Sequence, residues 1–304
     1  MNALPKVCVL VLNYNGTADT DECIASLEDL NYPKYQVLLI DNGSRDESWR
    51  QILQKYPKTA VLENGKNLGY AGGNNAGICW ALEHGYEDVF ILNNDTTVDP
   101  QALEVLERFS QTNPTATILA PKVLSYEHPQ VIHSLGTTLD WFRLRPKTAF
   151  YGFSEKKGWI QPHDRLIVPG SALLLKNKLL KEVGLFDEKY FLIHEDADLC
   201  LRNLKAGFRN VVLPEARIYH KESRSLSLVP FLSRYYSTRN FLYLSRTHAN
   251  FFQKIMTVAG TLFLYTKNLF IWIGEGFPSR SASKAFLTGV IDFFRSRTGA
   301  KVMP

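Results

Sequence analysis

The chain has 304 residues, 45% hydrophobic and 21% charged, so it can bury one large core or one domain plus an appendage. This composition excludes a disordered or fibrous protein. Its four cysteines form no CxxC pair, which excludes the common zinc motifs and a disulfide framework and favours a reducing compartment. The first apolar run, Val7–Leu12, is too short for a signal-peptide core, so we expect no export.

Charge is unevenly distributed along the chain. Residues 221–304 hold twelve Lys/Arg and three Asp/Glu, a net charge of +9, which leaves −4 on residues 1–220 of a chain whose net charge is +5. The same segment carries fifteen Phe, Tyr and Trp. Basic and aromatic residues together are typical of segments that bind nucleic acid or an anionic membrane surface. We therefore expect the two parts to have different partners.

Apolar runs alternate with helical periodicity before residue 90, the pattern of a doubly wound parallel sheet. The first helix is predicted from about Thr20 to Pro33, and the second begins at a capping box formed by Ser44 and Glu47. The predicted strands are Val7–Leu12, Tyr35–Ile40 and Ala60–Leu62.

Each of these strands ends in a polar loop, and ligands of open α/β sheets bind outside the carboxyl ends of the strands. The third loop is the glycine-rich run Asn67–Gly77, which leads into a helix predicted at Ile78–His84. Its backbone can approach a phosphate at the helix start, although its spacing fits neither the dinucleotide motif nor the P-loop. A flexible loop is the alternative interpretation.

A fourth buried strand begins at Asp88 and runs into a turn that holds Asp95, followed by a helix that Asp99 and Pro100 begin. Asp95 therefore faces the same crevice as the earlier loops. A single Asp in such a position is either a turn-forming residue or a catalytic or metal-binding group.

The middle of the chain is less regular. After a strand at Thr117–Ala120, basic and aromatic residues are interleaved from Trp141 to Trp159, which predicts either a lid over the substrate or a solvated loop. Two strand pieces are predicted between Leu166 and Leu175, with a bend at Gly170 and Ser171. A short helix then ends near Gly184.

Three carboxylates, Glu195, Asp196 and Asp198, crowd the first turn of a helix that we expect to end at Gly207. They are either caps favoured by the helix dipole or functional groups whose crowding is relieved by a cation or a raised pKa. A strand beginning at Arg209 and a single histidine, His220, follow.

In this order the motifs resemble an inverting glycosyltransferase of family 2 with the GT-A fold, in the branch that contains rhamnosyltransferases of bacterial polysaccharide assembly. The resemblance covers residues 7–220, and the C-terminal segment matches only loosely. The matching segments are Val11–Gly16, Leu39–Ser44, Asn67–Gly69, Gly73–Gly77, Leu92–Thr96, Pro169–Ser171, His194–Leu199 with Arg202, and His220.

The resemblance implies an α/β fold with a mostly parallel, Rossmann-like sheet flanked by helices. It implies a nucleotide-sugar domain at residues 1–225, and the basic and aromatic composition of the remainder predicts a helical, membrane-associating region at 226–304. Asp196 would be the general base, and Asp95 and His220 would hold Mg²⁺ or Mn²⁺. The acceptor would contact Gly170, Ser171, Glu195 and Trp159. The donor would contact Asn13, Asn15, Asp41, Asn42, Asn67, Gly69, Asn74, Asn75, Asn94 and Asp95.

One residue departs from the family's DxD motif, because Asn93 stands where the first acid usually stands. A neutral amide is a weaker ligand, so we expect the metal to be held less tightly, or mainly by Asp95 and the diphosphate. Asn93 is also the one feature that favours a non-catalytic nucleotide-binding protein.

The implied reaction is inverting transfer of a sugar. The best expectation for the donor is dTDP-rhamnose, with UDP-hexoses or UDP-galactofuranose as alternatives, and the expected acceptor is a saccharide, polyprenyl-linked, at the cytoplasmic face of a membrane. Nucleic acid is not an expected partner, because the basic segment contains no recognisable module. Ile255–Ile273 either spans the membrane or, as we expect, lies on its surface.

Overall fold

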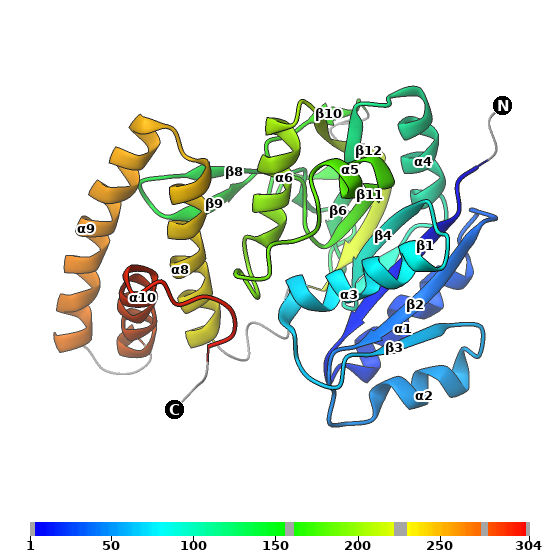
Figure 1. Cartoon of the computed structure of the whole chain (residues 1–304), viewed down its shortest axis with the longest axis horizontal. Coiled ribbons are helices and arrows are strands. Elements are labelled where there is room, and N and C mark those ends of the chain that lie inside the picture. Colours follow the sequence, from blue (N-terminus) through cyan, green and yellow to red (C-terminus); the bar gives the residue numbers. More distant parts are fainter. Residues whose placement is uncertain (1–3, 156–160, 222–229, 275–278, 302–304) are drawn as a thin grey trace.

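The computed structural model describes residues 4–155, 161–221, 230–274 and 279–301. It contains a twisted sheet covered by helices and, beside it, a bundle formed by the last three helices (Figure 1). This arrangement matches the expected α/β fold with a helical C-terminal extension. The expected boundary between residues 225 and 226 lies outside the described residues.

The first four strands and the three helices between them follow the predicted alternation. They are β1 (Val7–Asn13), α1 (Thr17–Glu28), β2 (Tyr35–Asp41), α2 (Ser48–Lys55), β3 (Ala60–Glu63), α3 (Gly69–Glu83) and β4 (Asp88–Asn93). These strands are parallel, and β1 lies between β2 and β4. Alternate residues of β1 enter two cores, with Cys8 and Leu10 on one face and Val9 and Val11 on the other. Because both faces are covered, the strand is apolar throughout.

The glycine-rich run is part of α3, so the prediction of a flexible loop and of a helix starting near Ile78 was wrong. Close packing against the sheet explains the glycines. A Cβ atom at Gly73 would lie 2.6 Å from Leu12 Cδ1, and one at Gly77 would lie 2.3 Å from Ile40 Cδ1. Helix propensity disfavours glycine, but only glycine lets this helix lie so close to β1 and β2.

The predicted capping box was also wrong. Helix α2 begins at Ser48, after Glu47 with a φ of +52°. Ser44 instead turns toward β1, where its hydroxyl oxygen accepts hydrogen bonds from Asn13 Nδ2 at 3.2 Å and from the Asn15 backbone N–H at 3.0 Å. The residue therefore organises the loops at the strand ends rather than a helix start.

The second half of the sheet differs more from expectation. Its elements are β5 (Thr96–Val98), α4 (Ala102–Thr112), β6 (Ala116–Ser125), β7 (Ile132–Ser134), β10 (His163–Asp164), β11 (Ala172–Lys176), α5 (Asn177–Glu182), α6 (Glu195–Lys205) and β12 (Arg209–His220). The strand order is β10-β12-β6-β11-β4-β1-β2-β3, with β5 beside β12 and β7 beside β6. Because β11 is antiparallel to both β4 and β6, the sheet is mostly but not entirely parallel.

Two strand predictions need correction here. Between residues 166 and 175 only β11 joins the main sheet, because Ile167 instead forms a bridge with Thr137. The strand predicted at Arg209–Leu213 continues to His220, with an irregularity in its pairing to β6 between Leu213 and Arg217. This continuation carries His220 to the edge of the sheet where β4 ends.

The C-terminal bundle consists of α8 (Pro230–His248), α9 (Phe251–Gly274) and α10 (Ser279–Phe294). By length and composition, Phe251–Ile273 is the one candidate membrane span among the described residues, with a mean hydropathy of 1.2 over a window that is 22% buried. Most of the helix is therefore not covered by the protein itself.

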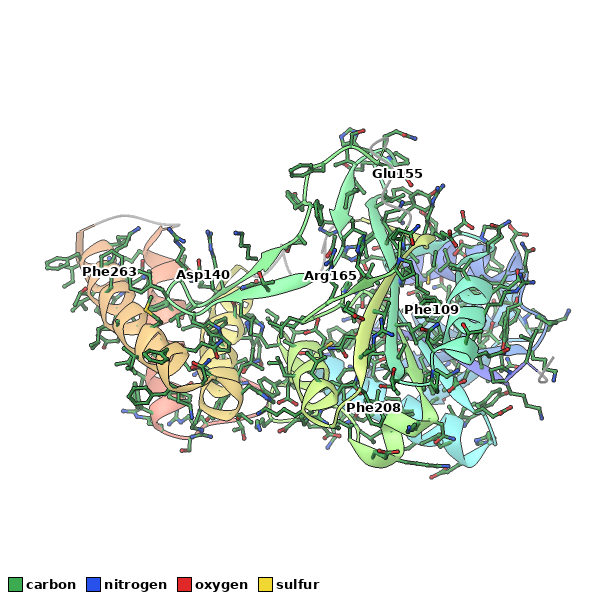
Figure 2. The ribbon with its side chains drawn as sticks, turned by 90° about the horizontal axis from the view of Figure 1, so that it is seen from above. Phe109, Asp140, Glu155, Arg165, Phe208 and Phe263 are labelled. Carbon is green, nitrogen blue, oxygen red and sulfur yellow. The ribbon has the colours of Figure 1, made fainter. Side chains whose placement is uncertain are left out.

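A hairpin of β8 (Thr137–Asp140) and β9 (Arg145–Thr148) leaves the main sheet and reaches the bundle (Figures 1 and 2). At its tip Leu144 is buried among residues of α8 and α10. The Phe142 carbonyl approaches α9 so closely that a Cβ atom at Gly260 would lie 1.9 Å from it. The hairpin is thus neither a free lid nor a solvated loop, because its tip fastens the bundle to the sheet.

Candidate functional site

A cavity of about 330 Å³ opens where β4, β12 and α6 meet. Its polar lining comes from segments far apart in the sequence, and the base of the β8–β9 hairpin closes one side. The lining includes Tyr70, Asn93, His133, Ser134, Thr137, Leu139, Pro146, Thr148, Gly170, Ser171, His194, Glu195, Asp196 and His220. Several sequence-predicted site residues therefore line one space.

Asp95 and His220 are brought together by the pairing of β5 with β12, in which His220 is the partner of Thr96. Their Oδ1 and Nε2 atoms lie 3.1 Å apart. Both side chains are buried, and neither atom makes a hydrogen bond within the described residues. A carboxylate oxygen and an imidazole nitrogen that converge without hydrogen-bond partners fit a divalent cation, for which both are ligands.

Asn93 lies in the same lining, and its buried Oδ1 atom also makes no hydrogen bond within the described residues. An amide oxygen can be a neutral ligand for a hard cation. No group of three or more His, Cys, Asp or Glu residues suited to a metal occurs in the described part of the chain. A cation bound here would therefore need oxygen atoms from a bound substrate or from water to complete its coordination.

The sequence analysis missed His133, which lies on β7. Its ring stacks on His220 with centroids 5.2 Å apart, and the two Nδ1 atoms are 3.3 Å apart. One Nδ1 must donate and the other accept, so His133 can keep the proton of His220 on Nδ1 and leave Nε2 free to face Asp95. Nothing in the irregular segment around His133 marked it as a site residue.

Asp196 lies in the first turn of α6, against Gly170. A Cβ atom at position 170 would lie 2.4 Å from Asp196 Oδ2. The Gly170 carbonyl accepts a hydrogen bond from the Tyr70 hydroxyl at 2.8 Å, and the Ser171 carbonyl accepts one from the Asn93 backbone N–H at 3.0 Å. Desolvation raises the pKa of Asp196, which makes the carboxylate a better proton acceptor.

The neighbouring Glu195 is buried, and its Oε2 atom makes no hydrogen bond within the described residues. Desolvation, together with the charge of Asp196, raises the pKa of Glu195 well above its ordinary value. Burial also lowers the pKa of His194 to about 4, so that imidazole is neutral at pH 7. Two neighbouring carboxyl groups at the helix start thus both have raised pKa values, and burial is the largest cause for each.

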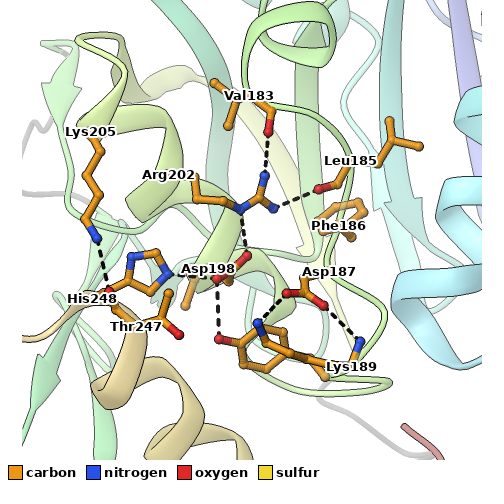
Figure 3. A network of polar contacts seen from close by, with 12 residues as sticks. Val183, Leu185, Phe186, Asp187, Lys189, Asp198, Arg202, Lys205, Thr247 and His248 are labelled. Carbon is orange, nitrogen blue, oxygen red and sulfur yellow. Dashed lines mark hydrogen bonds and ion pairs between the residues drawn. The ribbon is translucent and has the colours of Figure 1, made fainter. Parts of the chain in front are cut away.

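The third acid, Asp198, belongs to a different network (Figure 3). Its oxygens accept hydrogen bonds from Arg202 Nε at 2.8 Å and His248 Nε2 at 2.7 Å. Burial by itself would raise the pKa of Asp198, but the bonds from His248 and Arg202 outweigh it and lower that pKa. Asp198 therefore fastens α6 to α8, and the functional interpretation of the acidic cluster stays a prediction for Glu195 and Asp196 alone.

A second cavity, of about 510 Å³, lies at the ends of β1, β2 and β3 and is lined by Asp41, Ser44 and Asn67 among others. Here the predicted donor residues bond to one another. Asn13 Nδ2 donates to Asp41 Oδ1 at 3.4 Å, and Asp41 Oδ2 accepts the backbone N–H groups of Gly43 and Ser44.

The remaining predicted donor residues shape the surrounding loops. Asn42 Nδ2 donates to Asn67 Oδ1 and to the Gly69 carbonyl, and Asn67 Oδ1 also accepts the Gly69 N–H. Asn15 Oδ1 accepts the Arg45 N–H, and Asn94 Nδ2 donates to Thr20 Oγ1. These bonds hold the strand-end loops in one arrangement.

Two predicted donor residues are used inside the protein. Asn74 is buried and donates to the Tyr70 carbonyl. Asn75 exchanges hydrogen bonds with the backbone of Phe186 and also donates to Glu188, which fastens α3 to that loop. The predicted acceptor residue Trp159 lies outside the described residues.

The family model described as "Glycosyl transferase family 2" matches residues 8–182, more than half of the chain. The chain is also 28% identical, over 84% of its length and 90% of the relative's, to an N-acetylglucosaminyl-diphospho-decaprenol L-rhamnosyltransferase of Mycobacterium tuberculosis. It is 22% identical, over 84% of its length and 86% of the relative's, to the dTDP-rhamnosyl transferase RfbF of Shigella flexneri.

Two solved structures share the fold. A mannosyltransferase from Pyrobaculum calidifontis in complex with GDP-Man and Mn²⁺ has a TM-score of 0.60 and 15% identity, covering 97% of this chain and 89% of the other. GalNAc-T7 with UDP, GalNAc and Mn²⁺ has a TM-score of 0.61 and 17% identity, covering 72% and 44%. The GT-A fold expected from the sequence motifs is confirmed.

Proposed function

The chain belongs to glycosyl transferase family 2, and on that premise we propose that it transfers rhamnose with inversion from dTDP-rhamnose to a lipid-linked saccharide. One observation carries the proposal of catalysis: Asp95 Oδ1 and His220 Nε2 lie 3.1 Å apart without a hydrogen bond within the described residues, and His220 lines the same cavity as Asp196. Buried polar atoms without hydrogen bonds reduce stability. Their convergence therefore favours a ligand-binding role over a non-catalytic protein that only keeps the fold.

Asp95 and His220 would hold Mg²⁺ or Mn²⁺, with Asn93 Oδ1 as a weaker neutral neighbour. The cation would supply positive charge to the diphosphate leaving group. Both structural neighbours were solved with Mn²⁺, which supports a divalent cation in this fold. On this proposal His133 keeps His220 in the tautomer that presents Nε2 to the cation.

Asp196 acts as the general base. Its carboxylate takes the proton from the acceptor hydroxyl while that oxygen bonds to the anomeric carbon and the bond from this carbon to the diphosphate breaks. A single displacement of this kind inverts the configuration. Burial raises the pKa of the neighbouring Glu195, whose protonated form can donate a hydrogen bond to an acceptor oxygen, and the cavity wall formed by Gly170 and Ser171 positions that acceptor.

The acceptor is proposed to reach the enzyme at a membrane. Phe252 and Phe270 of α9 are each 76% exposed, and an apolar groove of about 660 Å³ runs between the three helices of the bundle. The cations Arg246, Lys254 and Arg295 line the same groove, where they can meet anionic lipid phosphates. The name of the M. tuberculosis relative specifies a decaprenol-linked acceptor. We therefore favour peripheral docking of α9 on the cytoplasmic face over a membrane span.

The donor is tested by thermal shift with Mn²⁺ and a panel of nucleotide sugars, followed by product analysis. A ligand at about 100 times its dissociation constant stabilises the folded state by about 2.7 kcal/mol. We expect dTDP-rhamnose to raise the melting temperature and to be consumed. Asp41→Ala is the control, because it removes the carboxylate that organises the donor loops. A shift by UDP-hexose or UDP-galactofuranose, with none by dTDP-rhamnose, would refute the rhamnosyl assignment but not the glycosyltransferase assignment.

A further inference from the structure

The backbone that leads into Glu195 and Asp196 is conformationally unfavourable. Phe191, Ile193 and His194 have φ angles of +61°, +69° and +76°, the left-handed region that residues with side chains rarely adopt. Such a residue persists only where its surroundings hold it. The turn at 190–194 therefore depends on its contacts, and so does the position of the first turn of α6.

One side of this turn packs against α3. The Phe191 carbonyl accepts the Ala71 N–H at 3.3 Å, and a Cβ atom at Gly69 would lie 2.3 Å from that carbonyl oxygen. Gly69 itself has a φ of +73°. No residue larger than glycine fits at position 69, which gives this predicted donor residue a clear role in supporting the turn.

The other side packs against α8, where Asn240 is fully buried. Asn240 Nδ2 lies 2.8 Å from each of the carbonyl oxygens of Tyr190, Leu192 and Ile193, among which its two N–H groups are shared. Its Oδ1 accepts a hydrogen bond from Arg239 Nε at 2.9 Å. A single amide thus gathers three carbonyls of the left-handed turn around its two N–H groups.

Arg239, which is 1% exposed, also binds backbone carbonyls of this turn. Its Nη2 donates to the carbonyls of Lys189 and Tyr190 at 3.3 Å, and its Nη1 donates to the Gly299 carbonyl at 2.8 Å. The guanidinium carbon lies 5.2 and 5.0 Å from the ring centroids of Tyr235 and Tyr236. Arginine and asparagine together tie the turn to α8 and to the C-terminal segment.

Two further contacts extend the attachment. Phe241 meets the His194 ring edge to face at 5.6 Å. At the far end of α8, His248 donates to Asp198 one turn into α6. Helix α8 therefore contacts α6 on both sides of Asp196. It holds the turn at 190–194 before this residue and Asp198 after it.

We propose that Asn240, supported by Arg239, is a positioning residue for Asp196, and that the C-terminal bundle is part of the catalytic apparatus as well as a membrane-docking device. The inference rests on the proposed role of Asp196 as the base. The donor cavity is built on β1, β2 and β3, on the far side of the sheet from α8 (Figure 1). Asn240 and the turn at 190–194 do not line the donor cavity, so loss of Asn240 should impair turnover far more than donor binding.

The test compares full-length Asn240→Ala with Asn268→Ala. Asn268 is also a buried amide of the bundle, but it donates to the Leu264 carbonyl of its own helix. With dTDP-rhamnose, Mn²⁺ and an isoprenoid-diphosphate-linked N-acetylglucosamine, we expect kcat of Asn240→Ala to fall by about 10- to 100-fold, the scale of a misplaced catalytic group. The donor KM and the thermal shift by dTDP should stay within about twofold, and Asn268→Ala should resemble the wild type.

Asn240→Ser keeps one donor group and should recover part of the lost kcat, which a loss of general stability would not predict. Equal kcat values for Asn240→Ala and Asn268→Ala would overturn the proposal, as would a parallel loss of kcat and dTDP binding in Asn240→Ala and Asn240→Ser. Asp196→Asn, measured alongside, separates the two hypotheses: full activity in that variant refutes the base assignment, whatever Asn240 does.

Discussion

The two cavities at the strand ends differ in how their polar atoms are used. On the β1–β3 side, Asn13, Asp41 and Ser44 bond to one another and to the backbone. On the α6–β12 side, Asp95 and His220 present buried atoms without hydrogen bonds within the described residues. An unpaired buried polar atom costs about 1–3 kcal/mol. The first side is thus held by its own hydrogen bonds, whereas the second leaves a carboxylate oxygen and an imidazole nitrogen available, as the proposed cation site requires.

The sharpest way to break this comparison is Asp196→Asn. We expect kcat to fall by about 10²- to 10⁴-fold, because a general base is lost while the shape of the cavity is kept. Thermal shift by the nucleotide should persist, since the donor loops are untouched. Turnover near that of the wild type would show that another group accepts the proton.

Asp95 and His220, whose facing atoms make no hydrogen bond within the described residues, predict metal dependence. EDTA should abolish activity and Mn²⁺ or Mg²⁺ should restore it, and Asp95→Ala should lower kcat/KM at least about 100-fold, because charge supplied by a metal is worth several kcal/mol. Asn93→Asp should lower the metal concentration that gives half of the maximal activity. Full activity in excess EDTA would exclude the proposed role.

The close approach of Gly170 to Asp196 predicts a smaller effect. The side chain of Gly170→Ala would have to displace the carboxylate, because its Cβ would lie 2.4 Å from Asp196 Oδ2. We expect kcat to fall by about 10- to 100-fold with an unchanged melting shift by dTDP. If kcat stays at the wild-type value, Asp196 does not need its observed position.

The exposed face of α9 is tested on liposomes. Replacing both Phe252 and Phe270 by serine should reduce flotation with anionic vesicles at least about tenfold, since each buried aromatic contributes about 1.5–3 kcal/mol. Turnover of a water-soluble acceptor should be unchanged. Phe153→Ser, an exposed residue of the sheet domain, is the matched control. Equal flotation of all three proteins would argue against docking through α9.

A buried charged cluster away from both cavities predicts the smallest effect, on stability alone. Lys176 Nζ lies 2.5 Å from Asp88 Oδ2 and 2.8 Å from Glu107 Oε2. Burial raises the pKa of Glu107 from 4.5 to about 7, with a further contribution from the negative charge of Asp88, and Lys176 opposes this shift only in part. The folded state then binds more protons than the unfolded state between these values, so stability should fall as pH rises through about 7. Glu107→Gln should flatten the melting temperature between pH 5 and 8 without changing activity. An equally steep pH dependence in the variant would assign it to other groups.

The sequence alone located β1, β2 and β4, because strands covered on both faces are apolar throughout and need no long-range information to be recognised. The order of motifs also predicted Asp95, Asp196 and His220 as site residues, and the fold brings Asp95 and His220 to within 3.1 Å of each other. The start of α3 was not predicted from the sequence. Its glycines have a low helix propensity, and the helix forms there because it packs closely on β1 and β2.

Only the tertiary structure placed together residues that no local pattern connects. His133 meets His220 across 87 positions, and Asn240 meets Ile193 across 47. The same is true of the hairpin tip. Its basic and aromatic composition was consistent with both a lid and a solvated loop, whereas the structure buries Leu144 in the bundle. Hydrogen bonds and packing between distant segments depend on how the chain folds back on itself, and periodicity reports only which face of an element is buried.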